Sequence, residues 1–205
     1  MTRLHVVAVL SVLAVSPAQI RAQSAHTDIP KGLGWPSVPE SGTEVRIWLE
    51  SNALVSELYR VVKVDQDVKV YRYAFSRVIH PAENGYSVTE ARHETQYSRK
   101  LLKKEQCSGE LATTADFLWC QIALQQHASW QLLFEDLLPD ELWKLPPQVS
   151  QSCGDVVIVD GETITIEMLE RGRTHVVSYS NPDTCCGTVA CAIADHVRSV
   201  IRNVY

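Results

Sequence analysis

The sequence contains no motif of the common catalytic or metal-binding classes. It has no G-x-S-x-G elbow for a nucleophilic serine, no H-E-x-x-H pair for zinc and no Gly-rich phosphate loop. It also lacks a C-x-x-C pair, which thiol redox enzymes commonly use. These absences exclude the best-known hydrolase, zinc and nucleotide-binding signatures, so we expect no catalytic residue, no metal site and no cofactor.

A long apolar run is missing as well. The apolar stretch Val6–Val15 is well short of the roughly 20 residues that a membrane-spanning helix needs. Because Arg3 precedes this stretch and small residues follow it, the pattern is that of a cleavable export signal in residues 1–22. We expect cleavage after Ala22, with Ala18 as the alternative, a secreted or periplasmic location, and no membrane span in the mature chain.

Positive charge is scarce relative to negative charge. The chain has 19 Lys and Arg against 24 Asp and Glu, a net charge of −5, and loss of the signal makes the balance more negative. This disfavours nucleic acid and anionic lipid as partners. One local basic cluster has acids nearby and indicates a solvated helix face, with a phosphate or heparin patch as the alternative: Arg99, Lys100, Lys103 and Lys104.

Six cysteines follow the signal, and an even number in an exported chain predicts disulfides. We expect one bridge between Cys107 and Cys120. A second is expected between Cys153 and one of three residues, Cys185, Cys186 or Cys191. These last three could instead form a redox or soft-metal cluster, because thiolates at a helix N-terminus have a lowered pKa.

The first half of the mature chain has the alternation of β-structure. Residues 23–43, rich in proline, are expected to form an extended arm. Glu44–Glu50 alternates apolar and polar side chains, which indicates a half-buried strand. Leu58–Val64 and Val68–Phe75 are β-rich runs on either side of a short polar turn, so they predict a hairpin.

The second half mixes helical and strand patterns. A capping box, Ser87 with Glu90, precedes a helix expected over Thr89–Lys104, and Trp130–Leu138 has the spacing of an amphipathic helix ended by Pro139. A helix is also expected from Pro182 to the C-terminus. The expected strands are Phe117–Leu124, Val156–Val159, Thr163–Leu169 and Thr174–Tyr179.

These patterns predict a single α+β domain over residues 44–205. We expect an antiparallel sheet of about five or six strands, one internal amphipathic helix and one C-terminal helix, stapled by disulfides. Trp48 alternates out of phase with the apolar side chains of its strand, so Trp48, Tyr71 and Tyr73 are candidates for a binding surface. The competing interpretation is that helices cover that face.

The leading functional hypothesis is a non-catalytic binding or structural module. The alternative is a secreted enzyme whose site combines a carboxylate with one of four histidines, His80, His93, His175 or His196. Such a site requires a histidine within hydrogen-bond reach of both a carboxylate and a nucleophile.

Several structural motifs together resemble a group of exported bacterial proteins of uncharacterised function. They are the strand Glu44–Glu50, the helix exit Glu141–Pro146, the turn Asp160-Gly161 and the strand start Arg173–Val177 before Asn181. The resemblance covers roughly residues 44–204. It implies an α+β domain exported by a bacterium, favours a non-enzymatic role and carries over no catalytic residue.

Overall fold

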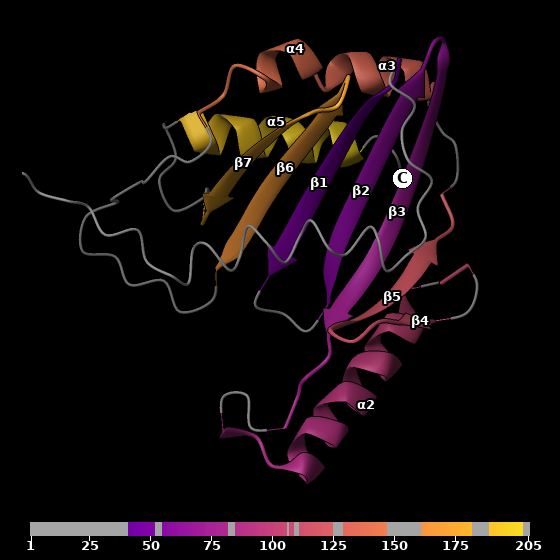
Figure 1. Cartoon of the computed structure of the whole chain (residues 1–205), viewed down its shortest axis with the longest axis vertical. Coiled ribbons are helices and arrows are strands. Elements are labelled where there is room, and N and C mark those ends of the chain that lie inside the picture. Colours follow the sequence, from indigo (N-terminus) through magenta and orange to yellow (C-terminus); the bar gives the residue numbers. More distant parts are fainter. Residues whose placement is uncertain are drawn as a thin grey trace, which may run out of the picture. The chain divides into compact units, whose positions relative to one another are not determined.

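A computed structural model describes residues 41–51, 55–81, 85–105, 107–108, 111–124, 129–146, 161–181 and 189–202. These residues lie in the compact unit Ser37–Tyr205. Seven antiparallel strands form one sheet in the order β4-β5-β3-β2-β1-β6-β7 (Figure 1). The α+β class is therefore confirmed, with one or two more strands than expected.

The elements have the following bounds. The strands are β1 Thr43–Ser51, β2 Ser56–Val64, β3 Asp67–Arg77, β4 Ala112–Thr113, β5 Phe117–Ile122, β6 Glu162–Glu170 and β7 Arg173–Ser180. The described helices are α2 Val88–Lys104, α3 Trp130–Asp136, the single turn α4 Pro139–Leu142, and α5 Val189–Arg202. The expected strand Val156–Val159 lies outside the described residues.

The predicted hairpin of β2 and β3 and the hairpin of β6 and β7 both turn at residues with positive φ. Asp65, with φ of 54°, turns β2 into β3, and Arg171 and Gly172, with φ of 50° and 71°, turn β6 into β7. Two consecutive positive φ values match the two-residue turn whose twist suits a hairpin. The strand added to the expected set is β4, which at two residues is too short to have a readable alternation.

The two halves of the sequence contribute to one sheet rather than two. Strand β1 pairs on one side with β2 and on the other with β6, so that Arg46 lies opposite both Arg60 and Glu167. Strand β1 thus lies between the β2–β3 and β6–β7 hairpins and joins them into one sheet. The described residues contain no helix that is long and apolar enough to cross a membrane.

One face of the sheet packs against the helices, and Figure 1 shows α5 crossing behind β7, β6 and β1. Alternate side chains of β1, among them Val45 and Ile47, point to this side, as the period of two in the sequence predicts. From α5, Val197, Val200 and Ile201 complete the core. Aliphatic burial of this kind is the main favourable contribution to folding.

The internal helix after Ser129 differs from its prediction. We expected one helix over Trp130–Leu138, but α3 ends at Asp136 and a new helical turn, α4, begins at Pro139. Between them Leu138 has φ of 49° and ψ of 58°. The reason is that proline disfavours the α-conformation in the residue before it, yet fits the first position of a helix.

Helix α2 and its disulfide follow the sequence prediction. Ser87 and Glu90 form the capping box in both directions. Cys107 and Cys120 are joined by a disulfide with Cα atoms 5.5 Å apart. Leu102 of α2 and Cys120 of β5 belong to one small buried cluster, so the bridge fixes the segment after α2 to the sheet.

Candidate functional site

The predicted aromatic surface lies on the sheet face opposite the helices. Strand pairing aligns Trp48, Leu58 and Tyr73 across β1, β2 and β3, on the side that the helix-facing core does not use. Trp48 is fully buried, Tyr73 is 8% exposed and Tyr71 is half-buried. Of the three candidates, Tyr71 retains the most exposed surface.

Trp48 belongs to a packed aromatic cluster. Its ring makes edge contacts with Phe75 at 5.7 Å and with Trp119 at 6.3 Å between centroids, and Phe75 stacks on Trp119 at 4.9 Å. Such pairs add to the free energy gained by burying the rings. The described surroundings of Trp48 are therefore those of a core residue.

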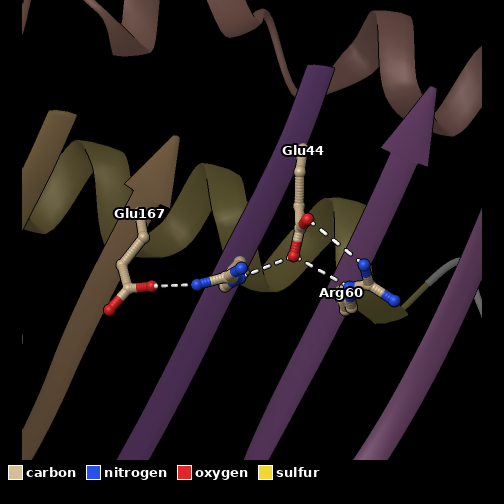
Figure 2. A network of polar contacts seen from close by, with 4 residues as sticks. Glu44, Arg60 and Glu167 are labelled. Carbon is tan, nitrogen blue, oxygen red and sulfur yellow. Dashed lines mark hydrogen bonds and ion pairs between the residues drawn. The ribbon is translucent and has the colours of Figure 1, made fainter. Parts of the chain in front are cut away.

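Beside this cluster lies a buried chain of charged side chains, drawn in Figure 2. Glu44 accepts hydrogen bonds from the Nε atoms of Arg46 at 2.5 Å and of Arg60 at 2.8 Å. Arg46 also donates to Glu167 at 3.1 Å. The guanidinium of Arg60 in turn lies 5.5 Å from the ring centroid of Tyr71. We call Glu44, Arg46, Arg60 and Glu167 the ionic network.

Among the described residues, the ionic network pairs two carboxylates with two guanidinium groups. Glu44, Glu167 and Arg60 are at most 3% exposed, so their charges need close partners. The contacts cross three adjacent strands, β6, β1 and β2. A buried network of paired charges in the middle of a sheet suits the fixing of strand register better than the binding of a charged ligand.

Two of the four candidate histidines contact backbone carbonyl groups, and His93 is exposed on α2. His175 lies 3.0 Å from the carbonyl oxygen of Leu145, and His196 lies 2.8 Å from that of Asp136. Among the histidines of the described segments, His80 alone is paired with a carboxylate, that of Asp116, at 3.3 Å. Within the described residues no hydroxyl or thiol is hydrogen-bonded to His80, so the pair lacks the nucleophile that the enzyme hypothesis requires.

The cysteine cluster can be assessed only at Cys191. This residue is buried on α5, with its Sγ 3.9 Å from a carboxylate oxygen of Asp195. Cys153, Cys185 and Cys186 lie outside the described residues. In the part of the chain that the structure describes, no group of three or more His, Cys, Asp or Glu side chains could hold a metal ion.

An open groove alongside α2 is the candidate ligand site. It runs between α2 and the segment that follows β3, and its volume of about 510 Å³ is within the usual range for ligand pockets. We call it the α2 groove. Its apolar lining is Val78, Ile79, Pro81, Val88 and Ala91, and its polar lining is His80, Arg92, Thr95, Gln96 and Arg99.

Two positive charges of the α2 groove have no carboxylate partner among the described residues. Arg99 donates to the hydroxyl of Thr113 at 3.3 Å, and Arg92 forms no ion pair with any residue that the structure describes. Five other arginines do pair with carboxylates: Arg46, Arg60, Arg72, Arg173 and Arg198. In an acidic chain, the α2 groove is thus a basic site with an apolar lining.

The arginine pair of the groove could have been found in the sequence from its spacing, although not from a motif. Arg99 was singled out as part of a basic cluster, but Lys100 and Lys103 of that cluster do not line the groove. Arg92 lies seven residues before Arg99, so both project from one side of α2. Spacing on the helix, rather than the density of charge, identifies the pair.

No protein-family model, curated protein or solved structure matches this chain. The functional argument therefore starts from the geometry of the α2 groove.

Proposed function

We propose that this chain is an exported, non-catalytic binding module whose α2 groove holds an amphiphilic organic anion. The observation that carries the proposal is the pair Arg92 and Arg99, which have no carboxylate partner in the described part of the chain and flank an apolar lining. An anionic group would receive charge-assisted hydrogen bonds from the guanidinium groups. The apolar part of the ligand would displace water from Val78, Ala91 and Val88.

The spacing of the arginines supports a single, compact acid group. Seven residues along an α-helix separate two Cα atoms by about 10 Å along the axis. Both long side chains can reach an anion placed between them, next to Thr95 and Gln96, which add uncharged hydrogen-bonding groups. A carboxylate, sulfonate or phosphate carrying an aliphatic or aromatic body has the matching chemistry.

Export is supported by the chemistry of the cysteines. The bridge between Cys107 and Cys120 suits an oxidising compartment, where disulfides form and persist. The protein recovered from the periplasm or medium of an expression host is expected to lack residues 1–22. Mass analysis of the recovered protein tests this. Recovery of the full-length chain in the cytoplasm would contradict export without affecting the ligand proposal.

The ligand proposal is tested with anilinonaphthalene sulfonate, a fluorescent aromatic sulfonate. We expect saturable binding to the wild-type protein and a loss of affinity of about tenfold or more in R92Q/R99Q, because each lost charged hydrogen bond contributes roughly 1.5–3 kcal/mol. The matched control is K100Q/K103Q, which removes the same charge from the same helix outside the groove.

Unchanged affinity in K100Q/K103Q, together with loss in R92Q/R99Q, supports the α2 groove. Equal losses in both variants would mean that only the overall charge of α2 attracts the probe. Unchanged binding in R92Q/R99Q would place the probe elsewhere, and the proposal would fail. Circular dichroism of each variant shows whether the fold is retained.

A further inference from the structure

The two edges of the sheet differ in how they are protected from other strands. Strand β4 forms one edge and has only two residues, which leaves little backbone to pair. Strand β7 forms the other edge and has eight residues, of which only Arg173, at its start, is charged. Natural proteins usually shorten, bend or charge such an edge, or place proline there. Strand β7 has none of these devices along its central residues.

Strand β7 is also regular. Its pairing with β6 runs without a bulge from Glu170 opposite Arg173 to Thr163 opposite Ser180. The amide of Asn181 continues the ladder by donating to the carbonyl of Glu162 at 2.6 Å. Because hydrogen-bonded residues alternate along an antiparallel strand, the odd-numbered residues of β7 bond to β6. The even-numbered ones direct their backbone groups outward.

The four outward residues are Thr174, Val176, Ser178 and Ser180. Their side chains are small and uncharged, and each is exposed or half-buried. Within the described part of the chain, no strand pairs with this side of β7. The edge therefore presents an uninterrupted row of backbone donors and acceptors with no charge to repel another strand.

We propose that β7 pairs antiparallel with β7 of a second copy of this chain, so that two sheets become one continuous sheet. Outward residues must pair with outward residues, and a two-fold axis at Val177 satisfies this condition. It places Thr174 opposite Ser180 of the second copy and Val176 opposite Ser178 of the second copy. Each such pair exchanges two backbone hydrogen bonds. In this register the outward pairs bring only small, neutral side chains together, and the intervening pairs set His175 opposite Tyr179 and Arg173 opposite Asn181. No two like charges face each other, which favours a second copy as the occupant.

The register predicts a charge-reversal test at the two exposed ends of the strand. In T174K/S180K, lysines face lysines of the second copy, and like charges directly opposite each other destabilise paired strands. In T174K/S180E, each lysine faces a glutamate of the second copy. Both variants change the same two exposed positions, so both are expected to fold like the wild type.

Sedimentation velocity of protein purified from an exporting host, over a range of micromolar to submillimolar concentrations, measures the dimer. We expect a reversible wild-type dimer, a dissociation constant raised about tenfold or more in T174K/S180K, and recovery in T174K/S180E. A wild-type protein that stays monomeric overturns the proposal. A dimer that T174K/S180K leaves intact, or one held by a disulfide on a non-reducing gel, places the contact elsewhere. Neither outcome bears on the α2 groove.

Discussion

The helix-covered face of the sheet is held by aliphatic side chains, whereas the opposite face buries ion pairs beside an aromatic cluster. On the first face Ile47 and Ile166 are fully buried among other apolar groups. On the second, Glu44 is equally buried but is surrounded by the guanidinium groups of Arg46 and Arg60. Apolar burial is non-directional, while buried charges need specific partners. Changes that nearly preserve side-chain shape should therefore cost much more stability on the second face than on the first.

The largest effect is expected from Glu44→Gln. The amide has nearly the same shape as the carboxylate but no charge, so Arg60 loses the two hydrogen bonds to an ionised acceptor. Breaking a buried ion pair from one side destabilises by about 3–5 kcal/mol. Urea denaturation followed by circular dichroism measures the change in the free energy of unfolding.

The double variant E44M/R60M is the control for Glu44→Gln. It removes one charge of each sign and leaves Arg46 hydrogen-bonded to Glu167. We expect E44M/R60M to be more stable than E44M alone. If Glu44→Gln costs less than about 1 kcal/mol, the ionic network does not contribute as a buried ion pair.

On the other face, Ile166→Val is expected to cost about 1 kcal/mol, the usual loss for one buried methylene group. Ile166 is fully buried in the helix-facing core, and valine keeps its branched shape. The same denaturation measurement applies. A loss as large as that of Glu44→Gln would remove the difference between the two faces.

Much of the fold was predictable because its elements are local. The alternation in β1, the two hairpins and the capping box each depend on residues close in sequence. The disulfide joins cysteines only 13 residues apart. The pairing of β1 with β6 was not predictable, because Arg46 and Glu167 are separated by 121 residues and periodicity does not select a distant partner.

The candidate site was less predictable than the fold. The α2 groove exists because the segment that includes Ile79 and His80 returns alongside α2, and the sequence gives no sign of this proximity. The ionic network was hidden for a similar reason. Glu44 and Arg46 occupy the polar positions of an alternating strand, and such positions usually face water. Only the neighbouring strands reveal that Glu44 is buried and that Arg46 is half-buried.

A smaller effect on stability is expected at the N-cap of α2. This helix packs on the same face of the sheet as the apolar core. Ser87→Ala removes the hydroxyl that accepts from the amide of Glu90 at 3.3 Å. Because this hydrogen bond is long and exposed, we expect the free energy of unfolding to fall by about 0.5–1 kcal/mol, at the lower end of the range for helix N-caps. Thermal unfolding monitored by circular dichroism measures it. A neutral result would mean that tertiary packing alone fixes the start of α2.

The same cap has a pH dependence of defined sign. Hydrogen bonds from Ser87 lower the pKa of Glu90 below 4.5 in the folded state. The contribution of Glu90 to stability is then present above pH 4.5 and is lost as the pH falls through the lower, folded pKa. Ser87→Ala removes one of these hydrogen bonds. We therefore expect the S87A protein to lose less stability than the wild type as the pH falls below 4.5.

The smallest effect at neutral pH is expected from Tyr179→Phe, on the helix-covered face. The hydroxyl of Tyr179 is buried, and no hydrogen-bond partner for it exists among the described residues. Its removal should be neutral or slightly stabilising. Burial raises the pKa of Tyr179 above 10.0, so its contribution is complete below pH 10.0 and is lost as the pH rises through the folded pKa. Above pH 10.0 we therefore expect Y179F to retain more stability than the wild type. Parallel alkaline unfolding curves for the two proteins would instead mean that the hydroxyl is solvated, and that the helix-covered face is less strictly apolar than its packing implies.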